Sequence, residues 1–396
     1  MDAKKIRGDF PILESGVIYM DNAATSLTPE QVVMAEQEYY RHYNANIHRG
    51  VHALSQISSQ HYELVYEKVA KLIGSMPEEI VFTKNTTEGI NLIARGLEWK
   101  KGDKVVVTIA EHHSNFLPWL RLKRYGVDLE IVNCSNEGTF DVSDFENVVD
   151  EKTRVIALSS ASNVLGSILP AEEIGKIAKD NDALFLIDAA QSVPHMETDI
   201  DRLNCDFLAF SGHKMLASTG VGVLYVKKEL QGMIEPLQLG GGSVQDVDIE
   251  GYTLKKSSRR FEAGTPPIAQ IIGLGAAIDY LMDTGYENIE KHEKKLTKIA
   301  LKGLNGIEGI EVYGPPAEKR IGVISFNIRN LDPHEVAFIL SQRNIMMRSG
   351  YHCCLPLMKF LGLNDGAVRA SLYLYNTMEE VETFISVIGE IARELS

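Results

Sequence analysis

The sequence predicts an α/β fold in which a mostly parallel, seven-stranded sheet is covered by helices on both faces and is followed by a smaller C-terminal α/β domain. The first observation is the length, because 396 residues exceed what one hydrophobic core usually supports. The second is the alternation of short apolar runs with helix-compatible segments between residues 79 and 226. The third is a shorter alternation near the C-terminus. We expect an N-terminal arm over 1–15, a large domain over 16–278 and a small domain over 279–396.

Two helices are expected before the sheet, from Pro29 to about Tyr43 and from about Ser55 to Ile73, because apolar residues recur there with helical spacing. The polar segment between them contains His48, and it could be a ligand loop or a solvated connector. The predicted strands are apolar runs that end in polar residues. They are Glu79–Thr83, Lys104–Ile109, Val127–Val132, Val155–Ser159, Leu184–Ile187, Cys205–Phe210 and Gly222–Val226.

The C-terminal third begins with a long helical pattern, from Ile268 to about Leu304, which would bridge the two domains. Beyond it, strands at Glu311–Tyr313 and Gly322–Asn327 alternate with helices that start at His334 and Met378. The stretch between residues 243 and 260 is charged and irregular. The small domain is therefore expected to have its own sheet and helices.

Composition and charge favour a soluble globular protein, with 44% hydrophobic and 24% charged residues. A formal net charge of −14 disfavours nucleic acids and anionic membranes as partners. The first residues lack the apolar core of a signal peptide, and no window reaches the roughly 18 apolar residues of a membrane span. Only four cysteines occur, and two of them are adjacent, so a disulfide framework is not expected. We expect a cytoplasmic protein that uses its thiols chemically.

A lysine and an aspartate stand directly after two of the predicted strands. Lys214 follows the run Cys205–Phe210, and Asp188 ends the apolar run that begins at Leu184. Because the carboxyl ends of parallel strands meet at one sheet edge, the amine and the acid would face the same site. This pair suits pyridoxal phosphate (PLP), whose aldehyde needs a lysine imine and whose ring nitrogen needs an acidic partner. Taken singly, each could equally be a surface lysine or a capping aspartate.

Other polar residues follow the strands at the same edge. Thr86 and Thr87 open a predicted helix, where hydroxyl and free backbone N–H groups can form a phosphate cup; a simple helix cap is the alternative. His112 could stack on a flat ring, or could be a polar rim histidine. The remaining candidates carry side-chain hydrogen-bond donors. They are Asn163 and Gln191 for the phenolic oxygen of the cofactor, and Ser211 and His213 for its phosphate.

Short motifs that match one family of enzymes are spread over almost the whole chain. They are Asp21-Asn-Ala-Ala-Thr25, Asn46-Ile-His-Arg-Gly50, Thr86-Thr-Glu-Gly-Ile-Asn91, Glu111-His-His-Ser-Asn115, Ser162-Asn-Val-Leu-Gly166, Asp188-Ala-Ala-Gln191, Ser211-Gly-His-Lys214, Arg260-Phe-Glu-Ala-Gly-Thr265, Arg348-Ser-Gly-Tyr-His-Cys353 and Arg369-Ala-Ser371. Together they resemble the PLP-dependent fold-type I enzymes of aminotransferase class V and, within them, the cysteine desulfurases of the SufS type. The segment that ends in Cys353 is the motif most specific to the desulfurases.

The resemblance implies a role for each candidate. Lys214 would bind PLP and then act as general base, Asp188 would pair with the pyridinium nitrogen, and His112 would stack on the ring. The phosphate ligands would be Thr86, Thr87, Ser211, His213 and, from the other subunit of a homodimer, Thr265. Gln191 and Asn163 would steady the phenolic oxygen of the cofactor. The substrate L-cysteine would be bound by Arg369 with Asn163, and by Arg348 and His48.

Cys353 would supply the thiolate that takes sulfur from the substrate as a persulfide, leaving L-alanine. Arg348 and His352, as actual or potential cations, could lower the pKa of this thiol. The alternatives are a small buried cysteine at 353 and structural ion pairs for Arg348 and Arg369. A metal site at His352, Cys353 and Cys354 lacks the usual ligand spacing, so no metal is expected.

Three departures from the family pattern stand out. Tyr351 replaces a second histidine, Cys354 replaces a small residue, and the turn 217–220 lacks the usual Gly-Pro. Cys354 could pack or could resolve the persulfide, and packing is the preferred interpretation. The resemblance implies sulfur supply to an acceptor or scaffold protein of iron–sulfur cluster assembly. A selenocysteine lyase, a cysteine sulfinate desulfinase and a slow sulfur-relay scaffold are the alternatives.

Overall fold

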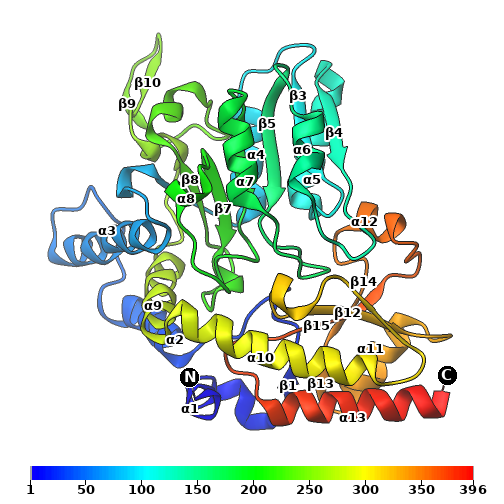
Figure 1. Ribbon diagram of the computed structural model, residues 1–396. Coiled ribbons are helices and arrows are strands. Elements are labelled where there is room, and N and C mark those ends of the chain that lie inside the picture. The colour runs from blue at the N-terminus through cyan, green and yellow to red at the C-terminus, as the bar shows by residue number, and fades with distance from the viewer. Residues whose placement is uncertain (1, 396) are drawn as a thin grey trace.

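The computed structural model describes residues 2–395. Figure 1 shows one large sheet flanked by helices and, beneath it, a smaller unit crossed by α10 (Tyr286–Asn305) and α13 (Met378–Leu395). The strands of the large sheet lie in the order β2-β8-β7-β6-β5-β3-β4. Their bounds are β2 (Ile80–Thr83), β3 (Lys104–Thr108), β4 (Asp128–Val132), β5 (Thr153–Ser159), β6 (Leu184–Asp188), β7 (Phe207–Ser211) and β8 (Gly222–Val226).

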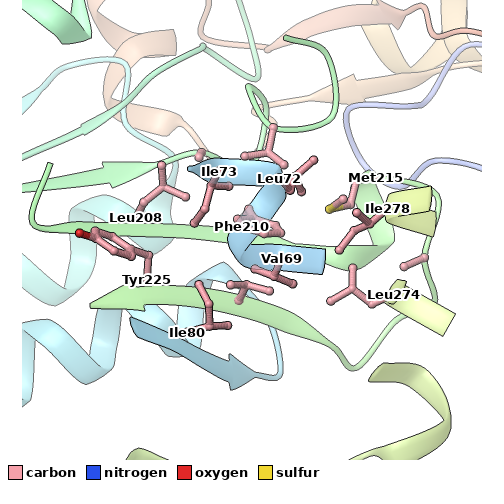
Figure 2. Close-up of a cluster of buried hydrophobic side chains, with 14 of the residues drawn as sticks. Val69, Leu72, Ile73, Ile80, Leu208, Phe210, Met215, Tyr225, Leu274 and Ile278 are labelled. Carbon is pink, nitrogen blue, oxygen red and sulfur yellow. The ribbon is translucent and has the colours of Figure 1, made fainter. Parts of the chain in front are cut away.

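The strands are apolar throughout because both faces of the sheet are buried. Successive side chains of a strand point to opposite faces, so Phe185 and Ile187 enter one hydrophobic cluster while Leu186 enters another. Helices α2 (Glu30–His42), α3 (Ala53–Ile73), α7 (Ala171–Asp180) and α9 (Ile268–Thr284) contribute to the first cluster. Figure 2 shows part of it, with Val69 of α3 beside the sheet residue Phe210. Helices α4 (Thr86–Gly96) and α5 (His113–Leu122) cover the other face.

Strand β8 is the one member of this sheet that runs against its neighbours. It pairs antiparallel with β2 and β7, while the pairs formed by β7, β6, β5, β3 and β4 are parallel. The connection from Ser211 to Gly222 is too short for the crossover that a parallel neighbour needs, so the chain turns back. The predicted fold class, with its mostly parallel seven-stranded sheet, is confirmed. The carboxyl ends of β2, β3, β5, β6 and β7 meet at one edge.

The C-terminal part forms a second, antiparallel sheet in the order β11-β12-β15-β14. Its strands are β11 (Ile310–Tyr313), β12 (Val323–Ile328), β14 (Arg348–Gly350) and β15 (Ala367–Ser371). Helices α10, α11 (Pro333–Gln342) and α13 bury apolar side chains against it. The first two strands agree with the sequence-based expectation, whereas β14 and β15 were not expected because their residues are polar or small.

Two expectations about local structure are wrong. The long helical pattern after Ile268 is interrupted at Gly285, where φ is 81°, so α9 ends at Thr284 and α10 begins at Tyr286. Glycine accepts this backbone conformation without a steric penalty. The charged stretch after residue 243 is an antiparallel hairpin of β9 (Val244–Val247) and β10 (Tyr252–Leu254).

The shorter helices are α6 (Val142–Val148), α8 (Ile200–Leu203) and α12 (Leu355–Phe360).

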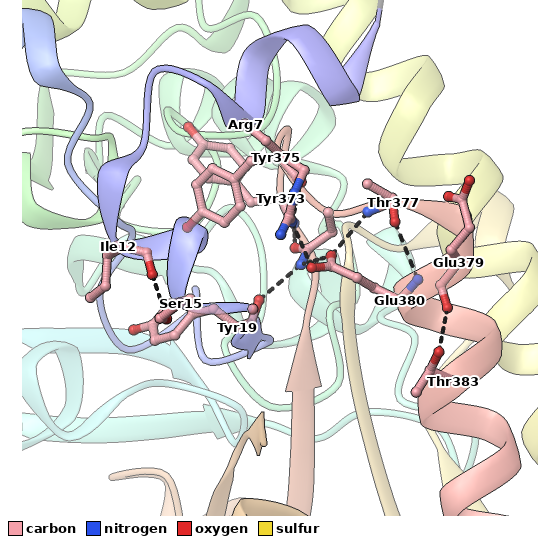
Figure 3. A network of polar contacts seen from close by, with 12 residues as sticks. Arg7, Ile12, Ser15, Tyr19, Tyr373, Tyr375, Thr377, Glu379, Glu380 and Thr383 are labelled. Atoms are coloured by element: carbon pink, nitrogen blue, oxygen red, sulfur yellow. Dashed lines mark hydrogen bonds and ion pairs between the residues drawn. The ribbon is translucent and has the colours of Figure 1, made fainter. Parts of the chain in front are cut away.

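The N-terminal segment is fastened to the C-terminal part of the chain. Helix α1 (Ala3–Arg7) places Arg7 2.6 Å from the Glu380 carboxylate, in the polar network of Figure 3. Strand β1 (Ile18–Tyr19) pairs in parallel with β13 (Ile345–Met346). This pairing carries the following residue pair, Met20 and Asp21, to β15 and so toward the edge where the large sheet ends. In residues 2–395 we find no helix with the length and apolar character needed to cross a membrane.

Candidate active site

A cavity of about 230 Å³ lies at the carboxyl edge of the large sheet, where the small sheet approaches it. Most of the residues predicted for the site line this one cavity. They are Thr86, Thr87, His112, Asn163, Asp188, Gln191, Ser211, His213, Lys214, Arg348, Cys353 and Arg369. His352, Ser114 and Ala23 also contribute to its wall. Residues from eight widely separated segments of the chain therefore converge on one space.

Lys214 and Asp188 approach the cavity from adjacent strands. Asp188 is the last residue of β6, is 4% exposed, and accepts a hydrogen bond from the Ala190 backbone N–H at 3.0 Å. Lys214 ends the short turn after β7, and Ser26 anchors this turn by donating its backbone N–H to the His213 carbonyl oxygen at 2.9 Å. Burial lowers the pKa of Lys214 to about 8 although the Asp188 carboxylate opposes the change. Burial also raises the pKa of Asp188, against the effect of Lys214.

The start of α4 forms the polar end of the cavity. Asn85 caps the helix by accepting from the Glu88 backbone N–H at 3.0 Å, so Thr86 and Thr87 are the first helical residues and not the cap. Ser211 accepts from the Thr86 backbone N–H at 2.9 Å. The first-turn N–H groups of a helix carry partial positive charge and attract anions. Hydroxyl groups and a helix N-terminus thus make this end suitable for a phosphate.

His112 caps α5 and presents its ring to the cavity. Its Nδ1 accepts a hydrogen bond from the Ser114 backbone N–H at 3.1 Å, which places the ring proton on Nε2. Burial, followed by the charge of Lys214, lowers the pKa of His112 to about 3. The ring is therefore neutral at physiological pH. The Ser114 hydroxyl also lies 2.7 Å from the Thr87 hydroxyl, so one serine links the ring to the phosphate end.

The two amide side chains each bond to the protein as well as facing the cavity. Asn163 donates from Nδ2 to the His352 carbonyl oxygen at 2.9 Å. Gln191 donates from Nε2 to the Ala23 carbonyl oxygen at 2.8 Å, and its Oε1 is buried without a partner among residues 2–395. One donor of each amide is thus committed to positioning a neighbouring loop.

Both arginines share a single carboxylate, that of Asp21. Arg348 lies 3.2 Å from one oxygen of Asp21, and Arg369 lies 3.4 Å from the other. Arg369 is almost fully buried and also donates from Nη1 to the Asn163 carbonyl oxygen at 2.8 Å. Burial lowers the pKa of Arg369 to about 10, so it remains charged at physiological pH. The structural ion pair considered for each arginine exists, and it holds both guanidinium groups at the cavity wall.

Cys353 is the exposed cysteine of the four, and it lies in a strained turn that we call the Cys353 turn (351–354). His352 and Cys353 have φ values of 48° and 54°, a region that residues with a Cβ rarely adopt and that is often found at functional sites. Burial lowers the pKa of His352 to about 3. The expectation that His352 acts as a cation beside the thiol is therefore wrong, because burial keeps its ring neutral. Arg348 is the remaining cation of the expected pair.

Cys354 points away from the cavity into the protein. It is fully buried in a cluster with Leu357 and Met358, and its thiol donates to the Glu111 carbonyl oxygen at 3.3 Å. Burial raises the pKa of the Cys354 thiol. The packing interpretation of this residue agrees with these contacts. Among residues 2–395, no group of three or more His, Cys, Asp or Glu side chains is arranged to hold a metal ion.

Two predicted residues lie outside the cavity of the single chain. His48 is half-exposed, with its Nδ1 3.5 Å from a Glu63 carboxylate oxygen. Thr265 is exposed and lines a separate pocket beside Thr83 and Lys84. Neither residue lines the cavity of this chain.

Three residues that contribute to the site were given no role in the sequence analysis. Asp21 holds both arginines, Ser114 joins His112 to Thr87, and Glu111 lies fully buried behind the site. Glu111 accepts from the Ser159 backbone N–H at 2.9 Å and from the Thr108 hydroxyl at 2.6 Å. Ser114 follows the cap His112 by two residues, and histidine is not among the preferred N-cap residues, so this spacing did not identify it. Nothing in the sequence pairs Asp21 with residues more than 300 positions away.

The donors and charges of this cavity fit PLP. A buried carboxylate that faces a cavity favours a partner that carries a proton, and a pyridinium nitrogen is such a partner. The amine of Lys214 lines the same cavity, with a lowered pKa that favours imine formation. The helix N-terminus supplies the phosphate end.

Comparisons with known proteins agree with this geometry. The family model described as aminotransferase class-V matches residues 18–384. A "Probable cysteine desulfurase" from Pyrococcus abyssi is 50% identical and one from Methanothermobacter thermautotrophicus is 47% identical, each over at least 98% of both chains. The apo structure of a cysteine desulfurase from Thermococcus onnurineus has a TM-score of 0.96 at 49% identity, over 99% of this chain and 98% of the other. The Escherichia coli cysteine desulfurase CsdA has a TM-score of 0.93 at 32% identity, over 100% and 99%. The chain therefore belongs to the aminotransferase class-V family and, within it, to the group of the cysteine desulfurases.

Proposed function

We propose that this protein is a PLP-dependent cysteine desulfurase that converts L-cysteine to L-alanine and keeps the sulfur as a persulfide on Cys353. One observation carries the proposal. The exposed thiol of Cys353 lines the same cavity as Lys214, Asp188 and Arg369. An enzyme that only exchanged amino groups would have no use for a thiol at this position.

The residues that line the cavity support a set of cofactor contacts. Lys214 would bind the aldehyde carbon and Asp188 would keep a proton on the ring nitrogen. His112 would lie against the ring, and Thr87 and His213 would bind the phosphate. When bound, PLP withdraws electrons from the substrate and weakens the bonds at its α-carbon. Burial lowers the pKa of His213 to about 4, so its ring would contribute a neutral donor.

Lys214 and Arg369 would act on the amino-acid part of the substrate. The pKa of about 8 leaves a fraction of the Lys214 amine neutral near physiological pH, and this neutral amine can take the α-proton. The Arg369 guanidinium is charged, nearly buried and fixed by Asp21 and the Asn163 carbonyl oxygen. It would hold the α-carboxylate of L-cysteine. Asn163 and Arg348 lie beside it and would assist.

Cys353 would accept the sulfur. Its thiolate attacks the substrate sulfur, a sulfur–sulfur bond forms, and the carbon–sulfur bond of the substrate breaks with its electron pair moving to carbon. A proton from a neighbouring acid then completes the methyl group of L-alanine. The protein thiol becomes a persulfide. The two-electron oxidation of sulfur in this step is balanced by the two-electron reduction of the substrate carbon. Arg348 contributes positive charge close to this thiol.

We further propose that the protein is a homodimer of the SufS type. The support is the position of Thr265 and His48, which lie outside the cavity of their own chain and would be free to complete a partner's site. Sulfur would pass from Cys353 to an acceptor or scaffold protein of iron–sulfur cluster assembly. A cytoplasmic location is supported by the need to keep Cys353 reduced before each turnover.

The decisive experiment measures alanine and sulfide released from L-cysteine by the PLP-loaded wild type and Cys353→Ala, with and without a reductant. Cys354→Ala is the matched control because the neighbouring thiol is buried. Wild type and the control should make alanine, whereas Cys353→Ala should not. Alanine production by Cys353→Ala at the wild-type rate would refute the persulfide role. The same three proteins should be tested with L-selenocysteine and L-cysteine sulfinate, because a lyase or desulfinase would retain these activities without Cys353.

A further inference from the structure

His113 contacts both the Cys353 turn and Leu355, the residue that follows it, although it does not line the cavity. Its backbone N–H donates to the Cys353 carbonyl oxygen at 2.7 Å. Its ring Nε2 accepts from the Leu355 backbone N–H at 3.2 Å. Because the Leu355 backbone N–H can only donate, Nε2 of the His113 ring carries no proton and the ring is neutral. Burial lowers the pKa of His113, which agrees with this assignment.

The Cys353 turn depends on such contacts from outside. Two successive residues, His352 and Cys353, have positive φ values, and each costs free energy that the surroundings must offset. Within the turn, one backbone hydrogen bond links the Cys354 N–H to the Tyr351 carbonyl oxygen at 2.9 Å. The Asn163 amide donates a hydrogen bond to the His352 carbonyl oxygen. His113 is the residue that holds both Cys353 itself and the residue where the next helix begins.

Leu355 is the first residue of α12, and its backbone N–H is one of the first-turn donors that the helix itself cannot satisfy. The ring of His113 supplies the missing acceptor. Figure 1 shows α12 close to the sheet edge from which α5 starts. His113 directly follows His112. The start of α5 therefore fixes the position of the His112 ring at the cavity and also contacts the turn that carries Cys353.

We propose that His113 is a positioning residue that fixes the Cys353 thiol at the cavity through the Leu355 N–H···Nε2 hydrogen bond. The proposal rests on the proposed function of Cys353 as the nucleophile. His113 touches neither the cavity nor the exposed thiol directly, so its loss should slow the sulfur-transfer step without weakening substrate binding.

The side-chain variants separate the acceptor atom from the bulk of the ring. In His113→Gln the Oε1 atom can occupy the place of Nε2 and accept from Leu355. In His113→Leu the volume is kept and the acceptor is lost, and in His113→Asn the amide is too short to reach. We expect His113→Leu and His113→Asn to lower kcat for alanine about tenfold with KM for L-cysteine changed by less than about twofold. His113→Gln should regain most of kcat.

A second readout does not depend on turnover. Hydrogen exchange of the peptide that contains Leu355 should be faster in His113→Leu and His113→Asn than in wild type, and close to wild type in His113→Gln. His292→Leu is the matched control. That ring is also partly buried and also bonds to a backbone group, the Asn376 carbonyl oxygen at 2.9 Å, but far along the chain from Cys353. It should leave both kcat and the exchange of the Leu355 peptide unchanged.

The outcomes distinguish this proposal from the proposed function. Wild-type kcat and wild-type exchange in His113→Leu and His113→Asn would overturn the positioning role. Equal losses in the Gln, Leu and Asn variants would overturn the assignment to the Nε2 acceptor. If Cys353→Ala still made alanine, the function of Cys353 would fail, yet the exchange comparison would still report whether His113 holds the turn. If His113→Leu failed to fold, the comparison of Gln with Asn would decide the question.

Discussion

Replacing Lys214 by Met should stabilise the PLP-free protein. Burial lowers the pKa of Lys214 from 10.5 to about 8, so the folded chain holds this proton less tightly than the unfolded chain. At about 1.4 kcal/mol for each pH unit, keeping the ammonium charged in the folded cavity costs about 3 kcal/mol. Met has a similar length and carries no charge. The apo variant should therefore gain up to about 3 kcal/mol in its free energy of unfolding at neutral pH.

The pH dependence gives the sign of the effect. Below about pH 8 Lys214 is protonated in both the folded and the unfolded chain, so the full cost of burying its charge is present. Between about 8 and 10.5 the unfolded chain binds more protons than the folded chain, so the free energy of unfolding rises with pH. Above 10.5 neither state binds the proton and the cost is gone. The advantage of Lys214→Met should therefore shrink across this interval.

Urea unfolding of the apo proteins, followed by tryptophan fluorescence to which the buried Trp119 contributes, measures this difference. Wild type and Lys214→Met should be compared at several pH values from about 7 to about 10, because the difference between the two cancels the titrating groups that do not interact with Lys214. Lys302→Met removes an exposed lysine and serves as the control. If Lys214→Met had the same stability as wild type at neutral pH, and the two profiles ran parallel, the cavity would not desolvate this lysine and the reasoning would be refuted.

Three further changes test other parts of the site. Arg369→Lys should raise KM for L-cysteine about tenfold, because an ammonium cannot contact Asp21 and the Asn163 carbonyl oxygen while also gripping a carboxylate; steady-state kinetics would show this, and an unchanged KM would contradict it. Cys354→Ala should leave alanine production within about twofold and lower stability by about 1 kcal/mol, since the thiol is buried; loss of activity with intact folding would argue for a chemical role. Gly166→Ala should lower the free energy of unfolding by more than about 1 kcal/mol, because φ is 71° and the new Cβ would lie 2.7 Å from a carbonyl oxygen. Thermal unfolding would show this as a lower melting temperature, and a melting temperature equal to wild type would contradict the strain argument.

Much of the fold and the site was predictable because the signals are local. Apolar strand runs and helical periodicity identified the large sheet, and polar residues at strand ends predicted which side chains would meet at its edge. The secondary-structure predictions failed where the local sequence pattern does not determine the backbone conformation. The pattern from Ile268 onward is helical on both sides of Gly285, and one positive φ value separates the two helices. The short strands β14 and β15 carry arginine, serine and glycine, and they are strands because β15 pairs with β12 and β14 pairs with β15.

The amino-acid sequence by itself determined the chemistry of this protein. A lysine and an aspartate after apolar strands, and a cysteine after an arginine and a glycine, are properties of the chain that no packing detail changes. Tertiary structure decided the state of those groups. It buried His352 and so kept it neutral, turned Cys354 inward while leaving Cys353 exposed, and gave one carboxylate, Asp21, to two arginines. The exposure and charge state of a side chain, and the residues that it bonds to, depend on the distant segments that surround it. Local sequence pattern predicted which side chains would meet at the sheet edge, but not how deeply each would be buried.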